Sequence, residues 1–322
     1  MNTLAEKETG EARANLEVFA GTLLGLAQTD PDIVVVTSDS RGSGKLTPFG
    51  QKFPARHIEV GIAEQNLVGV AAGLASAGKK VFAVSPACFL TARALEQIKN
   101  DVAYSDNPVN LIGISAGVSY GALGTTHHSL HDFAVLRAIN NITVIAPADA
   151  FETEQAILEA ATSPHPFYIR FGKKAMPLLS YAGAQQFEVG KGRVIRKGSD
   201  LTLIATGETV YPSLQAADRL EEQGLSATVV SMHTIKPLDY SLLARVAASG
   251  KPIVTVEEHM IYGGLGEACA SFLLQQGFCN RMKIVGIPDE YTITGSQTEI
   301  FNHYGISAEG ISLTALQLVN KK

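Results

Sequence analysis

The residues that could carry out chemistry gather in the first half of the chain. Glu64 stands where a loop over residues 59–63 enters an apolar helix rich in small residues. Its carboxylate either caps the first turn of that helix or projects into a site, where it could handle a proton. Phe89 follows a predicted strand and serves either as a core residue or as part of a site at the end of that strand. These two residues are the first candidates for a functional site.

A polar loop over residues 121–132 contains several histidines. His127 and His131 have the i, i+4 spacing of metal ligands on one face of a helix, but no third ligand is evident. Three roles stay open for the loop: a metal site, a hydrogen-bonded structural role, and contact with a substrate. The roles of His128 and His131 are left undecided.

Alternating strand and helix patterns must position these segments. Short β-branched runs bounded by turn residues predict buried strands of a parallel sheet, and stretches with helical periodicity separate them. We expect two α/β domains, the first doubly wound, over residues 1–175 and 191–322, with a linker over 176–190. Predicted strands are 33–36, 81–84, 109–114, 143–146, 167–171, 201–205, 227–231, 253–256 and 283–286. Predicted helices are 12–27, 64–77, 92–103, 151–161, 212–223, 240–248, 266–276 and 308–319.

Composition excludes several classes of protein. The chain has 322 residues, of which 46% are hydrophobic and 18% charged, so it can form large cores and is not disordered. A net charge of −5 argues against a nucleic-acid partner. The acidic N-terminus lacks a signal peptide and no segment is apolar enough to span a membrane, so we expect a soluble protein. The cysteines form no CxxC pair and suit the cytoplasm.

In their order and spacing, these segments resemble the transketolase family. GIAEQN (61–66), CFL (88–90) with RALEQIKND (93–101), GTTHHSLHD (124–132) and FYIRFGK (167–173) are similar to its pyrimidine-binding half. TIKPLD (234–239) and EEHMIYGGLGEA (257–268) are similar to its C-terminal domain. The resemblance spans essentially the whole chain. On the basis of this resemblance, the chain is identified as the C-terminal subunit of a split, two-chain transketolase.

The resemblance implies thiamine diphosphate as the cofactor, whose thiazolium C2 must lose a proton to become a nucleophile. Glu64 matches the carboxyl group that bonds to N1′ of the pyrimidine and favours the imino form, whose N4′ accepts that proton. An apolar setting suits a carboxyl group that shares a proton with the ring. Phe89 matches the aromatic residue that stacks on the aminopyrimidine. Asp39 matches an acid near the thiazolium, with an Asx-turn residue as the alternative.

Other matches concern a sugar phosphate substrate. His127 matches a catalytic histidine that contacts substrate oxygens next to the reacting carbon. Arg170 and Ser43 match residues that bind the terminal phosphate, for which a guanidinium is well suited. The alternatives are a strand-end arginine paired to a carboxylate and an ordinary flexible loop. Arg93 either reaches the diphosphate side or makes a salt bridge on the helix surface.

The family holds the diphosphate through magnesium with a GDG motif, and the sequence contains no GDG. We therefore expect that an N-terminal transketolase subunit carrying this motif binds Mg²⁺, so that no metal ligand is expected here. This chain is then inactive alone, and two copies of each chain are expected to assemble.

Two departures from the family bear on the substrate. Leu123 stands where many relatives carry an acid that recognises a hydroxyl of the acceptor sugar, and Ser115 stands where many carry a histidine. A leucine cannot accept that hydrogen bond, and burying the hydroxyl unpaired would be costly. We therefore expect an unusual sugar, such as apulose 4-phosphate with release of dihydroxyacetone.

Three alternative functions stay open. Two are enzymatic: the β subunit of a 2-oxo acid dehydrogenase, and half of a deoxyxylulose phosphate synthase. The third is a non-catalytic regulatory subunit, against which the joint presence of the four matched residues argues (Glu64, Phe89, His127 and Arg170). In the second domain, we expect structural or interface roles for His233, Glu258 and His259.

Overall fold

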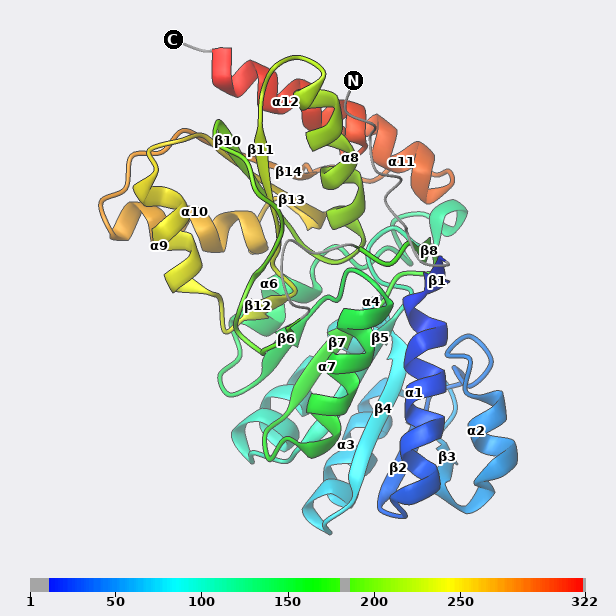
Figure 1. Ribbon diagram of the computed structural model, residues 1–322. Coiled ribbons are helices and arrows are strands. Elements are labelled where there is room, and N and C mark those ends of the chain that lie inside the picture. Colours follow the sequence, from blue (N-terminus) through cyan, green and yellow to red (C-terminus); the bar gives the residue numbers. More distant parts are fainter. Residues whose placement is uncertain (1–11, 180–185, 321–322) are drawn as a thin grey trace.

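The computed structural model describes residues 12–179 and 186–320 of the chain. These residues form two α/β units, each built on a mostly parallel sheet with helices on both faces (Figure 1). This confirms the predicted fold class. Of the expected linker 176–190, residues 180–185 lie outside the described part.

The first sheet has seven strands in the order β12-β6-β7-β5-β4-β2-β3. All neighbours pair in parallel except β12, which runs antiparallel to β6. Parallel strands place their carboxyl ends along one edge of the sheet, where ligands of such folds bind. The strands are β2 (Ile33–Thr37), β3 (His57–Glu59), β4 (Lys80–Pro86), β5 (Val109–Ile114), β6 (Thr143–Ile145), β7 (Phe167–Arg170) and β12 (Thr234–Lys236).

Alternating side chains of these strands pack against helices on opposite faces of the sheet. Phe82 and Val84 of β4 join the core under α1 and α7, whereas Val81 and Ala83 join the core under α3 and α4. Apolar residues at every strand position are therefore needed, as expected for a strand buried on both faces. The helices are α1 (Asn15–Thr29), α2 (Thr47–Lys52), α3 (Glu64–Ser76), α4 (Ala87–Arg93), α5 (Leu95–Gln97), α6 (Asp132–Arg137) and α7 (Ala150–Thr162).

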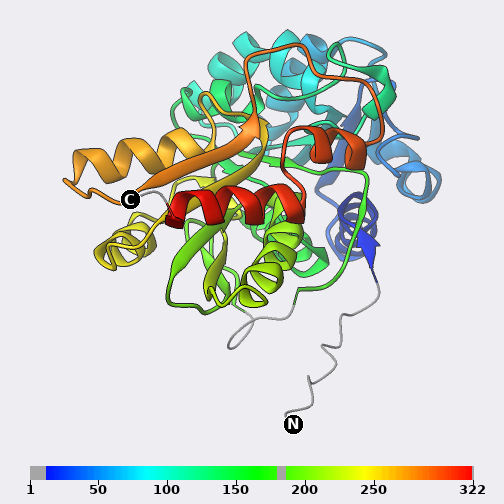
Figure 2. The same cartoon turned by 90° about the horizontal axis from the view of Figure 1, so that it is seen from above.

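The second sheet has five strands in the order β14-β13-β10-β11-β9, with β9 antiparallel. Helices α9 and α10 cover one face, and α8, α11 and α12 cover the other. Helices α8 and α12 lie side by side (Figure 2). The strands are β9 (Arg193–Arg196), β10 (Leu201–Ala205), β11 (Ala227–Ser231), β13 (Ile253–Met260) and β14 (Met282–Ile287). The helices are α8 (Val210–Glu221), α9 (Tyr240–Ala248), α10 (Leu265–Gln275), α11 (Gln297–His303) and α12 (Ala308–Asn320).

The two units share a core. One cluster of buried residues continues from α3 and α4 of the first unit to α9 and α10 of the second. The segment β12 belongs by sequence to the second half of the chain, yet it extends the first sheet. A further small sheet pairs β1 (Arg13–Ala14) with β8 (Ala175–Met176). Among the described residues, no helix is long and apolar enough to cross a bilayer.

One predicted helix was wrong in its form. The expected helix 92–103 begins earlier, at Ala87, is interrupted at Ala94, and continues as a π-helix over Ile98–Tyr104. Four buried residues at four-residue intervals share one core: Leu90, Ala94, Ile98 and Val102. Side chains four residues apart rotate progressively around an α-helix, because one turn holds about 3.6 residues. The wider turns of the π-helix keep such side chains on one face. Phe89 therefore lies in α4, just after the end of β4.

Candidate active site

Glu64 is the first residue of α3 and is 3% exposed. Its carboxylate accepts hydrogen bonds from Nη1 of Arg93, at 3.1 Å to Oε1 and 3.0 Å to Oε2. Arg93 comes from the last turn of α4, and its side chain is 48% exposed. Of the two interpretations of Arg93, the structure therefore contains a salt bridge. Glu64 therefore projects toward another helix, and within the described residues no side-chain hydrogen bond caps the start of α3.

Arg93 also contacts an aromatic ring, which in turn contacts a histidine. The guanidinium carbon of Arg93 lies 4.3 Å from the ring centroid of Phe89. The His127 ring meets Phe89 edge to face, with centroids 5.2 Å apart. We call the row Glu64, Arg93, Phe89 and His127 the Glu64 cluster. The structure thus brings together three of the predicted site residues, which lie far apart in the sequence.

His127 is half-buried between two aromatic rings, because Tyr120 also lies against it at a centroid distance of 5.4 Å. Lys173 covers the Tyr120 ring, with its ammonium 3.9 Å from the centroid. Among the described residues, Nδ1 of His127 pairs with the hydroxyl of Thr126 at 3.0 Å. This leaves Nε2 for a ligand. Sequence reasoning assigned no role to Tyr120, although an aromatic residue in a glycine-rich polar loop is a usable signal.

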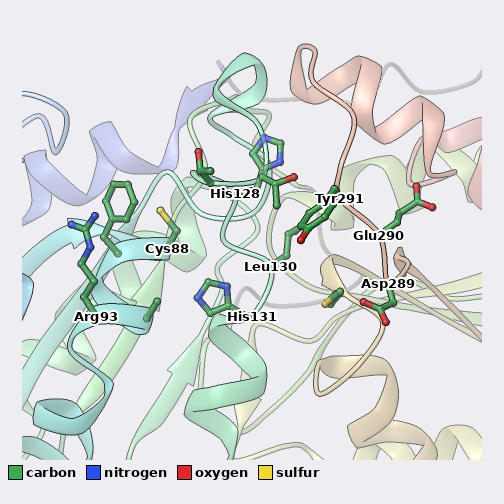
Figure 3. A pocket seen from close by; sticks show the side chains of 13 residues that line it. Cys88, Arg93, His128, Leu130, His131, Asp289, Glu290 and Tyr291 are labelled. Atoms are coloured by element: carbon green, nitrogen blue, oxygen red, sulfur yellow. The ribbon is translucent and has the colours of Figure 1, made fainter.

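Phe89 and Arg93 of the Glu64 cluster line a cavity of about 860 Å³. One wall belongs to the first unit and contains Phe89 and Arg93. Figure 3 shows Asp289, Glu290 and Tyr291 of the second unit on the opposite side, with His131 between the walls. Sequence reasoning missed this second wall. Its signal was an acidic segment, PDEY (288–291), which begins two residues after the predicted strand 283–286 ends.

Asp39 lies at the carboxyl end of β2 and is exposed, with a positive φ of 54°. Its backbone N–H donates to Oε1 of Glu59 at 2.6 Å. Glu59 also accepts from the Thr37 hydroxyl at 2.7 Å and from the Gly61 N–H at 2.9 Å. Partial burial raises the pKa of Glu59, but these three hydrogen bonds outweigh it and lower the pKa overall. Sequence reasoning missed Glu59, which holds the turn that presents Asp39.

Ser43 is exposed in the loop after β2, where its hydroxyl donates to the Ser40 carbonyl at 3.2 Å. Lys45 of this loop pairs with Glu17 at 3.4 Å. Arg170 lies elsewhere, at the end of β7. Within the described part of the chain, no contact joins the two residues that were expected to share a phosphate.

Arg170 is 6% exposed, and both of its terminal nitrogens donate hydrogen bonds. Its Nη1 donates to Asp132 at 2.8 Å and its Nη2 to the Glu258 carbonyl at 2.8 Å, while Phe133 lies 4.2 Å from the guanidinium carbon. The Tyr168 hydroxyl donates to the other oxygen of Asp132 at 2.7 Å. Of the two interpretations of Arg170, this is the arginine paired to a carboxylate. A phosphate could reach the guanidinium only if this arrangement opened.

The remaining histidines of the loop differ in their surroundings. His128 is 3% exposed, with Nδ1 2.6 Å from the Thr292 hydroxyl and Nε2 3.0 Å from the Gly121 carbonyl. His131 lines the cavity, and its Nε2 lies 3.4 Å from the Thr91 hydroxyl. In the described ranges, no group of three or more His, Cys, Asp or Glu side chains is placed to hold a metal ion. His128 thus has the structural role that was left open.

The two positions that depart from the family also differ. Leu123 is 53% exposed in the 3₁₀ turn Gly121–Leu123. Ser115 is buried at the end of β5, with a positive φ of 53°. Leu123 is therefore free to meet a ligand, and Ser115 belongs to the turn that starts the histidine segment.

Comparison with known families decides the identity of the fold. A model described as "Transketolase, pyrimidine binding domain" matches residues 11–177, and one described as "Transketolase, C-terminal domain" matches residues 190–311. The chain belongs to the transketolase family. This confirms the resemblance found in the sequence, and the chain is a transketolase subunit of a thiamine diphosphate-dependent family.

Individual relatives agree with this assignment. A subunit of the apulose-4-phosphate transketolase of Phocaeicola vulgatus is 47% identical over 303 residues, which cover 94% of this chain and 96% of that protein. A solved structure, "Split gene transketolase, inactive beta4 tetramer", has a TM-score of 0.85 and 35% identity, and covers 95% of this chain and 98% of its own. The 1-deoxy-D-xylulose-5-phosphate synthase of Syntrophotalea carbinolica is 37% identical over 315 residues, or 95% of this chain but only 49% of that enzyme.

Proposed function

We propose that this chain is the pyrimidine-binding half of a two-chain enzyme that transfers a two-carbon ketol unit between sugar phosphates. The other half is a separate chain with a GDG motif, which holds Mg²⁺ and the diphosphate. The observation that carries the proposal is the Glu64 cluster. It joins a buried carboxylate and a histidine to an arginine and an aromatic ring that line one cavity.

The residues of the cluster fit an aminopyrimidine. The Arg93 guanidinium stands in for such a ring, because it is planar, lies over Phe89 and donates N–H groups to Glu64. A flat, polar, hydrogen-bonding group is therefore already accommodated between the aromatic ring and the carboxylate. For an aminopyrimidine to take this place, the Arg93 side chain must turn away, which its half-exposed position permits.

When bound, thiamine diphosphate supplies the carbon nucleophile that takes up the ketol unit. Glu64 holds a proton at N1′ of the pyrimidine, and Phe89 orients the ring by stacking. His127 presents Nε2 to the substrate oxygens. Asp39, at the exposed end of β2, is the acid proposed to lie near the thiazolium.

For the terminal phosphate of the sugar, we retain Ser43 and Arg170 as proposed contacts. The surroundings favour Ser43, since it is exposed in a loop that also carries Arg41 and Lys45. Arg170 can contribute only after leaving its pair with Asp132. The positive charge needed by a phosphate is thus more accessible in the loop after β2.

Assembly with the second chain is part of the proposal. The relative that matches this chain nearly end to end is named a subunit, and the similar split-gene structure is described as an inactive β4 tetramer. We propose that this chain is likewise inactive alone and assembles with its partner as two copies of each. We place the enzyme in the cytoplasm, which the free thiols of Cys88, Cys269 and Cys279 support.

The substrate we propose is a branched ketose phosphate, apulose 4-phosphate. The name of the relative from Phocaeicola vulgatus supports it, as does the apolar and exposed Leu123. Cleavage between C2 and C3 leaves C4 and its phosphate on the released fragment. The product is therefore dihydroxyacetone phosphate rather than free dihydroxyacetone, and this ketone lacks the hydroxyl-bearing stereocentre that an acid would recognise.

The test is ketol transfer by this chain purified together with a GDG-bearing partner, with thiamine diphosphate and Mg²⁺. The donors are apulose 4-phosphate and xylulose 5-phosphate, the acceptor is an ordinary aldose phosphate, ribose 5-phosphate, and each chain is also assayed alone. We expect transfer only from the complex, fastest with the branched sugar. Equal rates with both sugars would overturn the proposal that apulose 4-phosphate is the substrate. Transfer by one chain alone would overturn the proposal that two chains share the active site.

Half of a deoxyxylulose phosphate synthase is the second candidate, because a synthase is 37% identical over 95% of this chain. Pyruvate with glyceraldehyde 3-phosphate forms the assay arm for this function. Carbon dioxide release from pyruvate, without transfer from ketose phosphates, would favour it. The same arm reports on the 2-oxo acid dehydrogenase alternative, and a complex inactive in every arm would favour a regulatory subunit.

A further inference from the structure

Two loops from different domains lock together beside the cavity. The first, which we call the histidine loop, spans residues 117–131, and the second, the capping loop, spans residues 288–296 of the C-terminal domain. Thr292 is 7% exposed at the contact, and its backbone N–H donates to the Thr125 hydroxyl at 3.1 Å. Gly121 has a φ of +51° and approaches Gly295 so closely that a Cβ would lie 2.6 Å from its carbonyl oxygen. The two loops therefore fit without space for rearrangement.

The hydrogen bonds between the loops have one consistent direction. The Gly121 carbonyl can only accept, so Nε2 of His128 carries the proton. Nδ1 of the neutral ring then accepts from the Thr292 hydroxyl at 2.6 Å. The Thr292 oxygen accepts in turn from the Thr125 hydroxyl at 3.0 Å. Every proton is assigned, and the chain of bonds starts and ends on the backbone.

Burial agrees with a neutral ring. His128 is buried, which lowers its pKa, and the nearby His127 lowers it further, although the bond to Gly121 raises it in part. A neutral imidazole with one fixed tautomer can accept from Thr292 at all pH values near neutrality. A charged ring would place a second proton on Nδ1 and break the sequence of bonds.

His127, the residue before His128, is held by the same part of the histidine loop. The Gly124 carbonyl accepts from the N–H groups of both His127, at 2.9 Å, and His128, at 3.1 Å. The far end of the loop is fixed by the bridge between Gly117 and Ser129. A displacement of His128 therefore moves the backbone that carries His127, and with it the ring that lies against Phe89.

We propose that Thr292 is a positioning residue contributed by the C-terminal domain: its hydroxyl holds His128, and through the histidine loop it orients His127 toward the substrate. Thr292 does not touch the substrate in this scheme, since its hydroxyl is consumed by His128 and Thr125. The inference rests on the proposed function. It gives the C-terminal domain a part in the reaction, which sequence reasoning did not find.

The test compares three variants in the assembled two-chain complex. Thr292→Val keeps the size of the side chain and removes the hydroxyl, and Thr292→Ser restores it. Thr294→Val is a matched control in the same loop, because it removes an exposed hydroxyl and keeps the methyl group that lies beside Gly124. We expect kcat/KM for ketol transfer to fall at least tenfold in Thr292→Val, chiefly through kcat. Thr292→Ser and Thr294→Val should remain within about threefold of the natural chain. A Thr292→Val complex that matches the control in kcat and KM would overturn the inference, as would a loss that serine does not restore.

A second readout does not depend on activity. In the chain labelled with ¹⁵N-histidine, the ring nitrogens of His128 should report a proton on Nε2 alone. Thr292→Val should shift the ring resonances of both His128 and His127, assigned with single His→Gln variants. A change confined to His128 would overturn the positioning of His127. If the natural complex showed no ketol transfer, the proposed function would fail, while these resonances would still test the contact between Thr292 and the loop.

Discussion

Arg93 reaches both oxygens of Glu64 with one nitrogen, at 3.0 and 3.1 Å, while its guanidinium lies over the ring of Phe89. The carboxylate is 3% exposed and the arginine is 48% exposed, so the pair connects a buried acid to the solvent side of the cavity. A buried carboxylate without a partner would be costly. Arg93 thus satisfies Glu64 in the place where the cofactor is proposed to bind.

Replacing Arg93 should tell whether its guanidinium competes with the cofactor. An ion pair with one exposed partner contributes about 0.5–1 kcal/mol, so Arg93→Ala should tighten thiamine diphosphate binding by the complex roughly two- to fivefold. Isothermal titration calorimetry measures this directly. Arg56→Ala is the matched control, because Arg56 also lies over a phenylalanine ring, 3.8 Å from the Phe53 centroid, but donates to the carbonyls of Ala27 and Asp30, before the amino end of β2 and away from the site. Weakening by tenfold or more would instead mean that Arg93 contacts the diphosphate.

We expect replacement of Arg170 to lower the stability of the fold, because its present contacts are structural. Arg170→Met leaves Asp132 buried without its cation, which typically costs about 3–5 kcal/mol and lowers the unfolding temperature by many degrees. Arg196→Met is the control, since Arg196 pairs with exposed acids worth roughly 0–1 kcal/mol. Thermal unfolding of the purified chain separates the two. An unchanged unfolding temperature together with a raised KM for sugar phosphates would show that Arg170 serves the substrate.

Glu208 should make stability fall as the pH rises. Burial, then the charge of Glu258, raises its pKa from 4.5 to about 8. A raised pKa favours the protonated carboxyl in the folded state, so this contribution is complete below pH 4.5 and is lost as the pH rises through about 8. Unfolding temperatures measured between pH 5 and 9 should decline, and Glu208→Gln should make the decline shallower. The exposed Glu96→Gln variant should follow the natural chain. A decline that is identical in Glu208→Gln would contradict the assignment.

Leu123 should tune the choice of acceptor. Leu123→Asp introduces a carboxylate able to accept a hydrogen bond from a sugar hydroxyl, so kcat/KM with ribose 5-phosphate should rise about tenfold relative to the branched-sugar reaction. Leu274→Asp is the control, because Leu274 is also an exposed leucine, at 79%, on α10. Assays in which ribose 5-phosphate and dihydroxyacetone phosphate, the acceptor of the branched-sugar reaction in reverse, compete for one ketol donor measure the ratio. If the ratio stayed the same in both variants, Leu123 would have no contact with the acceptor.

Local patterns were sufficient to predict most of the fold. The predicted strands 109–114, 201–205 and 227–231 coincide with β5, β10 and β11, because buried parallel strands need continuous β-branched and apolar residues. Strand β12 lies in the second half of the sequence but belongs to the first sheet, because it pairs with β6 where the two domains meet. Strand pairing across domains leaves no local signal.

The same limit applies to the candidate site. Sequence motifs located Glu64, Phe89 and His127, and the structure brings them together, while their chemical roles stay predictions. The partners of Arg170 and His128 lie 38 and 164 residues away in the sequence. Such contacts between distant residues are decided by tertiary packing, so the burial of Arg170 and the role of Thr292 could not be read from composition or spacing.

The central claim is that Glu64 handles the proton of a cofactor shared with a second chain. Its most direct test is ketol transfer by the two-chain complex carrying Glu64→Gln, which preserves shape and removes the acid. Glu309→Gln is the control, because Glu309 is also an acid in the first turn of a helix, α12, and is exposed. We expect transfer to fall by roughly a hundredfold or more in Glu64→Gln, in line with the loss of a general acid–base group, and to be unchanged in Glu309→Gln. Transfer by Glu64→Gln at the rate of the natural complex would contradict the claim.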